Sequence, residues 1–218
     1  MLAGSLLCEI RVNDHPLQQV LDFWFPTAVP DDHAEMVVRQ EWWFRGGADA
    51  AILERFGPLF ERVACGGLDR WKKYPSMRLA LIIVLDQFSR TIHRGSALAY
   101  ANDAKARALA REGIEAGHYA ALTDPWQKTF FLLPLGHSED VADLDRAVQL
   151  TQELAAEATE PRKRMLEFSA DQARRHREVL KRFGRQPHRN EVLGRVSTPD
   201  ELAYLAKGEL VHQRAVPR

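Results

Sequence analysis

The chain has 218 residues, of which 45% are hydrophobic and 28% are charged. These proportions exclude a disordered or collagen-like chain, because enough apolar surface is available to offset the entropy of ordering. The 30 basic residues balance the 30 acidic ones, so the chain lacks the basic excess typical of nucleic-acid-binding proteins. We expect a single domain over residues 1–218, with residues 1–15 a loose extension and residues 207–218 a loose tail.

Cysteine usage and hydropathy bear on the compartment. Cys8 and Cys65 form no CxxC pair and predict neither a disulfide framework nor a zinc site, so free buried thiols are expected. The longest apolar run covers seven residues, 79–85, whereas a helix needs about 20 to cross a bilayer. The N-terminus lacks the basic region of an export signal. The sequence therefore predicts a cytoplasmic protein without a membrane partner.

Helical periodicity begins in the N-terminal third of the chain. It predicts a short helix that stops at Pro26, a helix over residues 30–44, and a third helical stretch that ends near Cys65. Gly57 and Pro58 should split this third stretch, because a proline removes a hydrogen-bond donor from the helix.

The centre of the chain contains the helix that we expect to be most deeply buried. Residues 76–90 are apolar on nearly all sides, which is typical of a helix enclosed by others. An alanine-rich helix is predicted over residues 99–117. Asp124 and Pro125 then give the signature of a helix start, and that helix should end before Pro134.

Two helices of opposite charge follow, predicted at residues 139–157 and 161–183. Residues 134–160 hold seven acidic residues and one arginine, and residues 172–195 hold eight basic and two acidic residues. The two helices are either solvated or face each other. A capping box at Thr198 opens a last helix. With no strand pattern, the sequence predicts an all-α fold of about eight to ten helices in antiparallel hairpins, a tetratricopeptide-like stack.

Two of three polar clusters precede the basic helix. Asp86 and Arg90 lie four residues apart at the end of the buried helix, so they share one face and can pair. Such a pair either closes the helix end or lines a cavity. In the second cluster, Ser138 can cap the next helix, while His137 and Glu139 flank it. No HExxH pattern is present, so the sequence predicts no metal site.

The third cluster lies around the end of the basic helix. His176 belongs to the apolar stripe of that helix, where a histidine is more often a core residue than a ligand. The segment after Gly184 is rich in donors that suit a carboxylate or phosphate, or that bind helix carbonyls and the acidic helix instead. These donors are Arg185, His188, Arg189, Asn190 and Arg195.

Several sequence blocks, which include residues of these three polar clusters, resemble a known bacterial family, domain of unknown function 924, over nearly the full chain. The sequence departs from the family pattern at Ser89, Thr91 and His93. The resemblance implies an all-α, tetratricopeptide-like fold and no established activity. The blocks that carry it are residues 20–25 (VLDFWF), 85–88 (LDQF) with Arg90 and Arg94-Gly95, 133–135 (LPL) with 137–139 (HSE), 176–177 (HR), 182–185 (RFGR), 187–190 (PHRN) and 193–195 (LGR).

Two functions of different classes remain open. The first is the binding of a small anionic molecule or a peptide in a polar cleft, for which no nucleic acid and no cofactor are expected. The residues that would contact this ligand are Asp86, Arg90, His176, Arg185, Arg189, Asn190 and Arg195.

The second function is a hydrolase or transferase acting on an anionic or phosphorylated small molecule. His137 or His188 would be the general acid or base, with Glu139 or Asp86 as the carboxylate that orients it. A metal-dependent variant that also uses His176 lacks the usual spacing of ligands.

Overall fold

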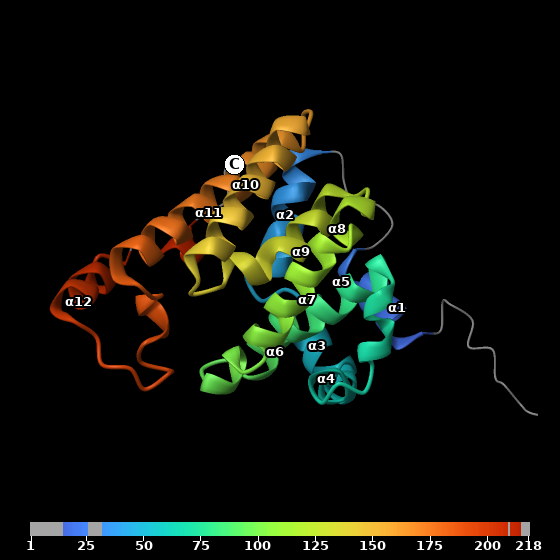
Figure 1. Cartoon of the computed structure of the whole chain (residues 1–218), viewed down its shortest axis with the longest axis horizontal. Helices are drawn as coiled ribbons and strands as arrows, with labels where there is room; N and C mark the ends of the chain where they lie inside the picture. Colours follow the sequence, from blue (N-terminus) through green and yellow to red (C-terminus); the bar gives the residue numbers. More distant parts are fainter. Residues whose placement is uncertain (1–14, 26–31, 209, 215–218) are drawn as a thin grey trace, which may run out of the picture.

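The computed structural model describes residues 15–25, 32–208 and 210–214. Expectations for residues 1–14, including the thiol of Cys8, lie outside the described residues. Every regular element within these ranges is helical, which confirms the all-α prediction. In chain order the α-helices (Figure 1) are α1 (Pro16–Trp24), α2 (His33–Phe44), α3 (Asp49–Arg55), α4 (Gly57–Ala64), α5 (Pro75–Ile83), α6 (Ser89–Ile92), α7 (Asp103–Glu115), α8 (His118–Ala121), α9 (Pro125–Gly136), α10 (Val141–Glu157), α11 (Lys163–Phe183) and α12 (Pro199–Ala206).

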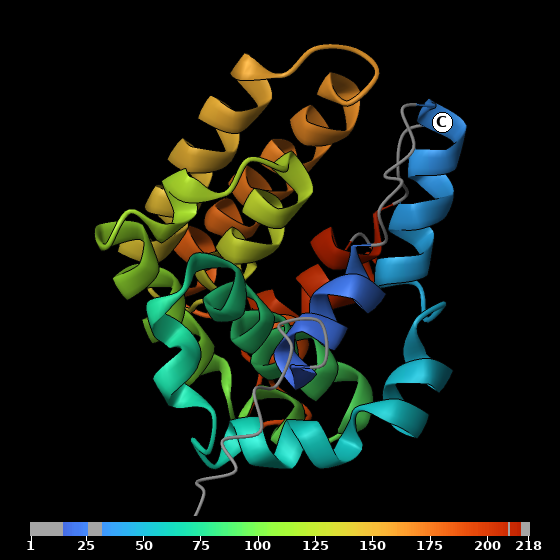
Figure 2. The ribbon, with the colours of Figure 1, turned by 90° about the vertical axis from the view of Figure 1, so that its right-hand side faces the viewer.

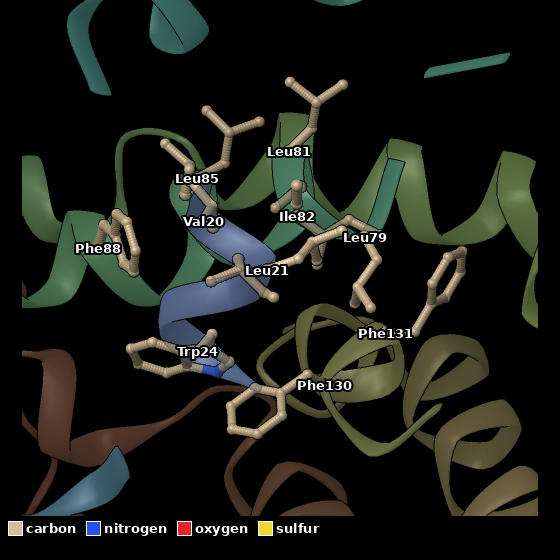
Figure 3. Close-up of a cluster of buried hydrophobic side chains, with 14 of the residues drawn as sticks. Val20, Leu21, Trp24, Leu79, Leu81, Ile82, Leu85, Phe88, Phe130 and Phe131 are labelled. Carbon is tan, nitrogen blue, oxygen red and sulfur yellow. The ribbon is translucent and has the colours of Figure 1, made fainter. Parts of the chain in front are cut away.

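Helix α5 lies at the centre of the molecule. All its residues from Met77 to Ile83 are buried, as its apolar surface on all sides predicts. Helices α1, α7 and α9 contact it. Figure 3 shows the apolar cluster that results, and burying each large side chain there contributes about 1.5–3 kcal/mol. Its labelled members are Val20, Leu21, Trp24, Leu79, Leu81, Ile82, Leu85, Phe88, Phe130 and Phe131.

Local signals set several helix ends as predicted. The Asp124 carboxylate accepts hydrogen bonds from the backbone N–H groups of Trp126 and Gln127, at 2.7 and 3.2 Å, and begins α9. Thr198 and Glu201 form the reciprocal capping box of α12. The predicted split lies at Phe56, so α4 begins with Gly57 and has Pro58 in its first turn.

Two helix ends differ from the prediction. Helix α9 continues through Pro134 to Gly136. The proline removes one backbone hydrogen bond from the helix, but the burial of Pro134 and Leu135 offsets this loss. Helix α10 is capped by Asp140, which accepts a hydrogen bond from the Ala142 N–H at 2.9 Å. Ser138 donates its hydroxyl hydrogen to Asp143 instead, so it is not the cap.

The prediction of a buried Cys65 thiol also needs correction. Cys65 is exposed, because it follows the last turn of α4 at the surface. Residues 210–214, which we call the C-terminal strap, are held against the helices. Gln172 of α11 donates a hydrogen bond to the Val211 carbonyl at 2.9 Å. Arg45 donates to the carbonyls of Gln213 and Arg214, at 3.0 and 2.8 Å.

The acidic and basic helices pack against each other as a long antiparallel pair, α10 and α11, seen side by side in Figures 1 and 2. The Arg177 guanidinium lies 3.4 Å from the Asp145 carboxylate across this pair. The finer prediction, a tetratricopeptide-like stack of such hairpins, is not confirmed. Within the described residues, no helix is both long and apolar enough to cross a membrane.

Candidate functional site

A cavity of about 160 Å³ lies between α9 and α11, with α10 as a third wall. Gln40 and Phe44 of α2 and His212 of the C-terminal strap complete its lining. The exposed wall is mostly apolar, and none of the described residues that line the cavity is an acid, a lysine or an arginine. Its remaining lining residues are Trp126, Thr129, Phe130, Leu132, Leu133, Gly136, His137, Ala147, Thr151, Phe168, Ser169, Gln172, Ala173 and His176.

Asp86 reaches the edge of this cavity from a π-helical turn. Helix α5 continues into this turn, which spans Val84–Phe88, before α6 begins. The wider turn was not predicted from the sequence. Single π-helical turns interrupt helices mostly where a side chain must be re-aimed, often at functional sites. This turn contains Asp86, and only 1% of the surface of Asp86 is exposed.

The Asp86 carboxylate binds one imidazole and one guanidinium. Its Oδ1 lies 2.8 Å from His137 Nδ1 and 3.1 Å from the Arg90 side chain, which confirms the expected Asp86–Arg90 pair. Burial favours the neutral carboxyl, but the charge of Arg90 and the contact with His137 hold its pKa well below the usual range.

The ionised state of Asp86 determines how His137 is protonated. Because an ionised carboxylate can only accept hydrogen bonds, His137 carries its proton on Nδ1. The other ring nitrogen, Nε2, has no hydrogen-bond partner among the described residues. His137 follows the last turn of α9, and its side chain is 22% exposed. The pair therefore holds the His137 imidazole in a fixed orientation at one end of the cavity.

The charges behind Asp86 are balanced. Arg90 also binds Asp103 at 3.0 Å, and Arg189 approaches the same carboxylate at 3.5 Å. Both guanidinium groups lie over the Tyr100 ring, at 5.6 and 5.0 Å from its centroid. Two carboxylates and two guanidinium groups thus form one neutral network. Asp103 was not singled out in the sequence, because its spacing from Arg189 is long-range.

The donors of the third cluster mostly hold residues 184–198 in place. Arg195 donates two hydrogen bonds to Glu139, at 2.7 and 3.0 Å, and the Gln186 N–H donates a third at 2.8 Å. Arg185 binds both oxygens of Glu201, at 2.6 and 2.7 Å. None of these side chains lines the cavity.

Asn190 and His188 also do not line the cavity, although His188 packs against His212, which does. Asn190 is fully buried and donates its amide to the Ser197 hydroxyl at 3.0 Å. The His188 ring packs on the His212 ring with centroids 4.4 Å apart. Burial, aided by neighbouring positive groups such as Arg189, lowers the pKa of His188 to about 2.

His176 is the second oriented imidazole of the cavity. It lies on the apolar face of α11, as predicted, and that face forms part of the cavity wall. Burial, together with nearby positive groups, lowers the pKa of His176 to about 3. The His176 ring is therefore neutral near pH 7.

The structure thus brings together Asp86, Arg90, His137, Arg189 and His176, whereas the side chains of Glu139, Arg185, Asn190 and Arg195 bind other partners and do not line the cavity. Sequence reasoning missed the aromatic lining, because Trp126, Phe130 and Phe168 have the helical spacing of ordinary core residues. No group of three or more His, Cys, Asp or Glu side chains suited to a metal ion occurs in the described ranges.

Over the described residues the protein is all-helical and has an apolar cavity beside a buried Asp–His–Arg network. Residues 20–209 match the family model described as bacterial protein of unknown function (DUF924), and the chain belongs to this family. A solved structure, the protein of unknown function ATU0120 from Agrobacterium tumefaciens, is 36% identical to this chain with a TM-score of 0.72. That comparison covers 88% of this chain and 97% of the other. No curated protein sequence matches the chain.

Proposed function

We propose that this protein binds a small organic molecule in the cavity between α9 and α11. The observation that carries the proposal is an apolar cavity that ends at His137, whose imidazole is held by the buried, ionised Asp86. Ligand sites typically combine apolar walls with a few fixed polar groups whose pKa values are perturbed. Asp86 and His176 both have such pKa values.

The cavity favours a small molecule over a peptide. A cavity of about 150 Å³ accommodates a molecule the size of benzene, and this one measures about 160 Å³. An extended peptide segment with several side chains needs more space.

The arginines expected to clamp an anion already bind carboxylates. Arg90 and Arg189 bind Asp103, Arg185 binds Glu201, and Arg195 binds Glu139. An anionic ligand would have to displace a carboxylate from one of these pairs. The proposal therefore rests on the cavity and not on the arginines.

Ala147 and Ala142 offer a matched pair of variants on α10. Ala147 lines the cavity, whereas Ala142 is exposed on the same helix. A panel of small cyclic and straight-chain molecules would be screened by saturation-transfer NMR against the wild type. We expect Ala147→Leu to abolish binding of the molecules that bind, and Ala142→Leu to leave it unchanged. Equal binding to both variants, or no binding to the wild type, contradicts the proposal.

The geometry of the Asp86–His137 pair supports a second candidate, an enzyme. An ionised carboxylate on Nδ1 leaves Nε2 to act as a general base, a role typically worth 10²–10⁴-fold in rate. In ester hydrolysis, Nε2 would take a proton from water as the water oxygen bonds to the acyl carbon. The ester C–O bond then breaks, and the proton passes to the leaving alcohol.

Uncharged acyl esters of the 4-nitrophenyl group test this candidate, because the released phenol is coloured. We expect His137→Gln to lower the rate by about a hundredfold or more. The variant His93→Gln is the control, because His93 lies outside the cavity. Equal rates for the wild type and His137→Gln remove the enzymatic candidate and leave the binding proposal intact.

A further inference from the structure

We infer that the molecule bound in the cavity is elongated and uncharged, with a hydrogen-bonding head beside His137 and a hydrocarbon tail along α9 towards Trp126. This inference rests on the proposed function, since it names the class of ligand for the same cavity. Three features of the wall carry it: its length, the distribution of its free polar groups, and its charge.

The wall of the cavity follows α9 along almost its full length. Trp126 is the second residue of α9, and His137 follows its last. Eleven residues of α-helix rise about 16 Å, so the lining is long relative to its volume. Helix α11 runs beside α9 and lines the cavity from Phe168 to His176, over about 12 Å of helix. Although its volume of about 160 Å³ is close to that of a cavity that holds benzene, a lining this long favours a narrow chain over a ring.

The hydroxyl groups in the wall donate hydrogen bonds to backbone carbonyls of their own helices. Thr129 donates to the Pro125 carbonyl at 2.9 Å, and Thr151 donates to the Ala147 carbonyl at 2.7 Å. Ser169 donates to the Met165 carbonyl at 3.1 Å. These bonds leave mainly methyl and methylene groups facing the middle of the cavity, which fits a hydrocarbon tail.

The side-chain amide and indole groups of the lining residues are also either paired with other residues or buried. Gln172 donates to the Val211 carbonyl and accepts from Arg214, at 2.9 Å each. Gln40 Oε1 and Trp126 Nε1 are buried and have no hydrogen-bond partner among the described residues. The Trp126 end therefore exposes mainly carbon, next to the rings of Phe44 and Phe130, which stack with centroids 5.6 Å apart.

The polar end of the slot is formed by imidazoles. His137 Nε2 has no hydrogen-bond partner among the described residues, and His176 of α11 lies at the same end of the cavity. A head group that donates a hydrogen bond, such as a hydroxyl, satisfies His137 Nε2. No acid, lysine or arginine belongs to the described lining, and His176 stays neutral because burial lowers its pKa. The nearby guanidinium groups of Arg90 and Arg189 are already paired with Asp103, so a carboxylate would lose its hydration here without gaining an unpaired arginine, which is costly.

Straight-chain primary alcohols and the matched carboxylates test this inference by isothermal titration at neutral pH. For the alcohols we expect Kd to fall about fourfold with each added methylene and then to level off when the tail reaches Trp126. The matched carboxylates should bind at least about tenfold more weakly. Cyclohexanol serves as a compact comparison ligand.

Thr151→Met tests the orientation of the tail. Helix α10 starts next to the His137 end and runs antiparallel to α9, so Thr151 lies towards the Trp126 end. We expect Thr151→Met to weaken the longer alcohols and to spare the short ones, while Ala142→Met changes neither.

The outcomes separate the inference from the proposed function. Binding of cyclohexanol without any dependence on alcohol chain length keeps the proposed function and overturns the inference. Carboxylates that bind as tightly as the alcohols also overturn it, and so does a Thr151→Met variant that weakens short and long alcohols equally. If none of the alcohols, carboxylates or cyclohexanol binds the wild type, both the inference and the proposed function are contradicted.

Discussion

Asp86 connects the buried interior with the cavity, because it accepts from His137 and Arg90 while being only 1% exposed. At the residue scale, its pairing with Arg90 could be predicted from their spacing of four residues. The partner His137 could not, since the two are 51 positions apart and meet only through the packing of α5 against α9. Spacing likewise did not reveal that Glu139 binds Arg195.

Asp86→Asn should destabilise the protein strongly. The substitution removes a buried charge that Arg90 and His137 both bind, and breaking a buried pair costs about 3–5 kcal/mol. Arg90 retains Asp103, so we expect the lower end of this range. Urea denaturation at pH 7 measures the free energy of unfolding. In Gln87→Ala one hydrogen bond to the ionised Asp86 carboxylate is lost while Arg90 and His137 remain, so we expect a smaller loss of about 1.5 kcal/mol. Similar losses for both variants contradict the role given to Asp86.

At the scale of elements, the starts of helices could be predicted from neighbouring residues in the sequence. Irregular turns inside helices could not, because they depend on tertiary packing. The caps at Asp124 and Thr198 use side chains within three residues, so the sequence alone contains them. The π-helical turn at Val84–Phe88 and the continuation of α9 through Pro134 have no comparable local signal. Both shape the end of the cavity, and the sequence could therefore not define the site.

Gly113→Ala tests the close packing of α7. A Cβ at this position would lie 2.5 Å from the Phe131 ring and 2.6 Å from the Arg78 side chain. Arg78 cannot move away easily, because it donates to the Leu109 carbonyl at 2.8 Å and to His118 at 3.0 Å. We expect a loss of about 1–3 kcal/mol from overpacking, measured by urea denaturation.

Gly57→Ala is the matched control at the start of α4, where a Cβ would meet nothing within 4 Å. We expect the stability of this variant to stay within about 0.5 kcal/mol of the wild type. If Gly113→Ala is equally harmless, α7 packs less closely against α9 and α5 than described here.

At the scale of the whole molecule, buried histidines predict acid sensitivity. The folded-state pKa values of His176 and His188 are lowered to about 3 and about 2, whereas a histidine in the unfolded chain titrates near 6.5. Above pH 6.5 both states are neutral, and no stability is lost. As the pH falls below 6.5, the unfolded chain binds protons that the folded chain does not, so the free energy of unfolding decreases.

The decrease should approach about 1.4 kcal/mol per pH unit for each of the two histidines between pH 6 and pH 4.5. Carboxylates with lowered pKa values, such as Asp86 and Glu201, add their own loss only at lower pH. Urea denaturation at pH 7, 6, 5.5 and 5 measures the slope, and His176→Phe should reduce it. A stability that is constant over this range contradicts the burial of these imidazoles.

The most direct test of the central claim, that the α9–α11 cavity binds a small molecule along its length, is an NMR titration with 1-octanol. The Trp126 indole N–H and the His137 ring report on the two ends of the cavity, and the Trp71 indole, outside it, is the reference. We predict saturable shifts at Trp126 and His137 with the same Kd and an unchanged Trp71 signal. Shifts of similar size at all three side chains, or at none of them, would contradict the claim.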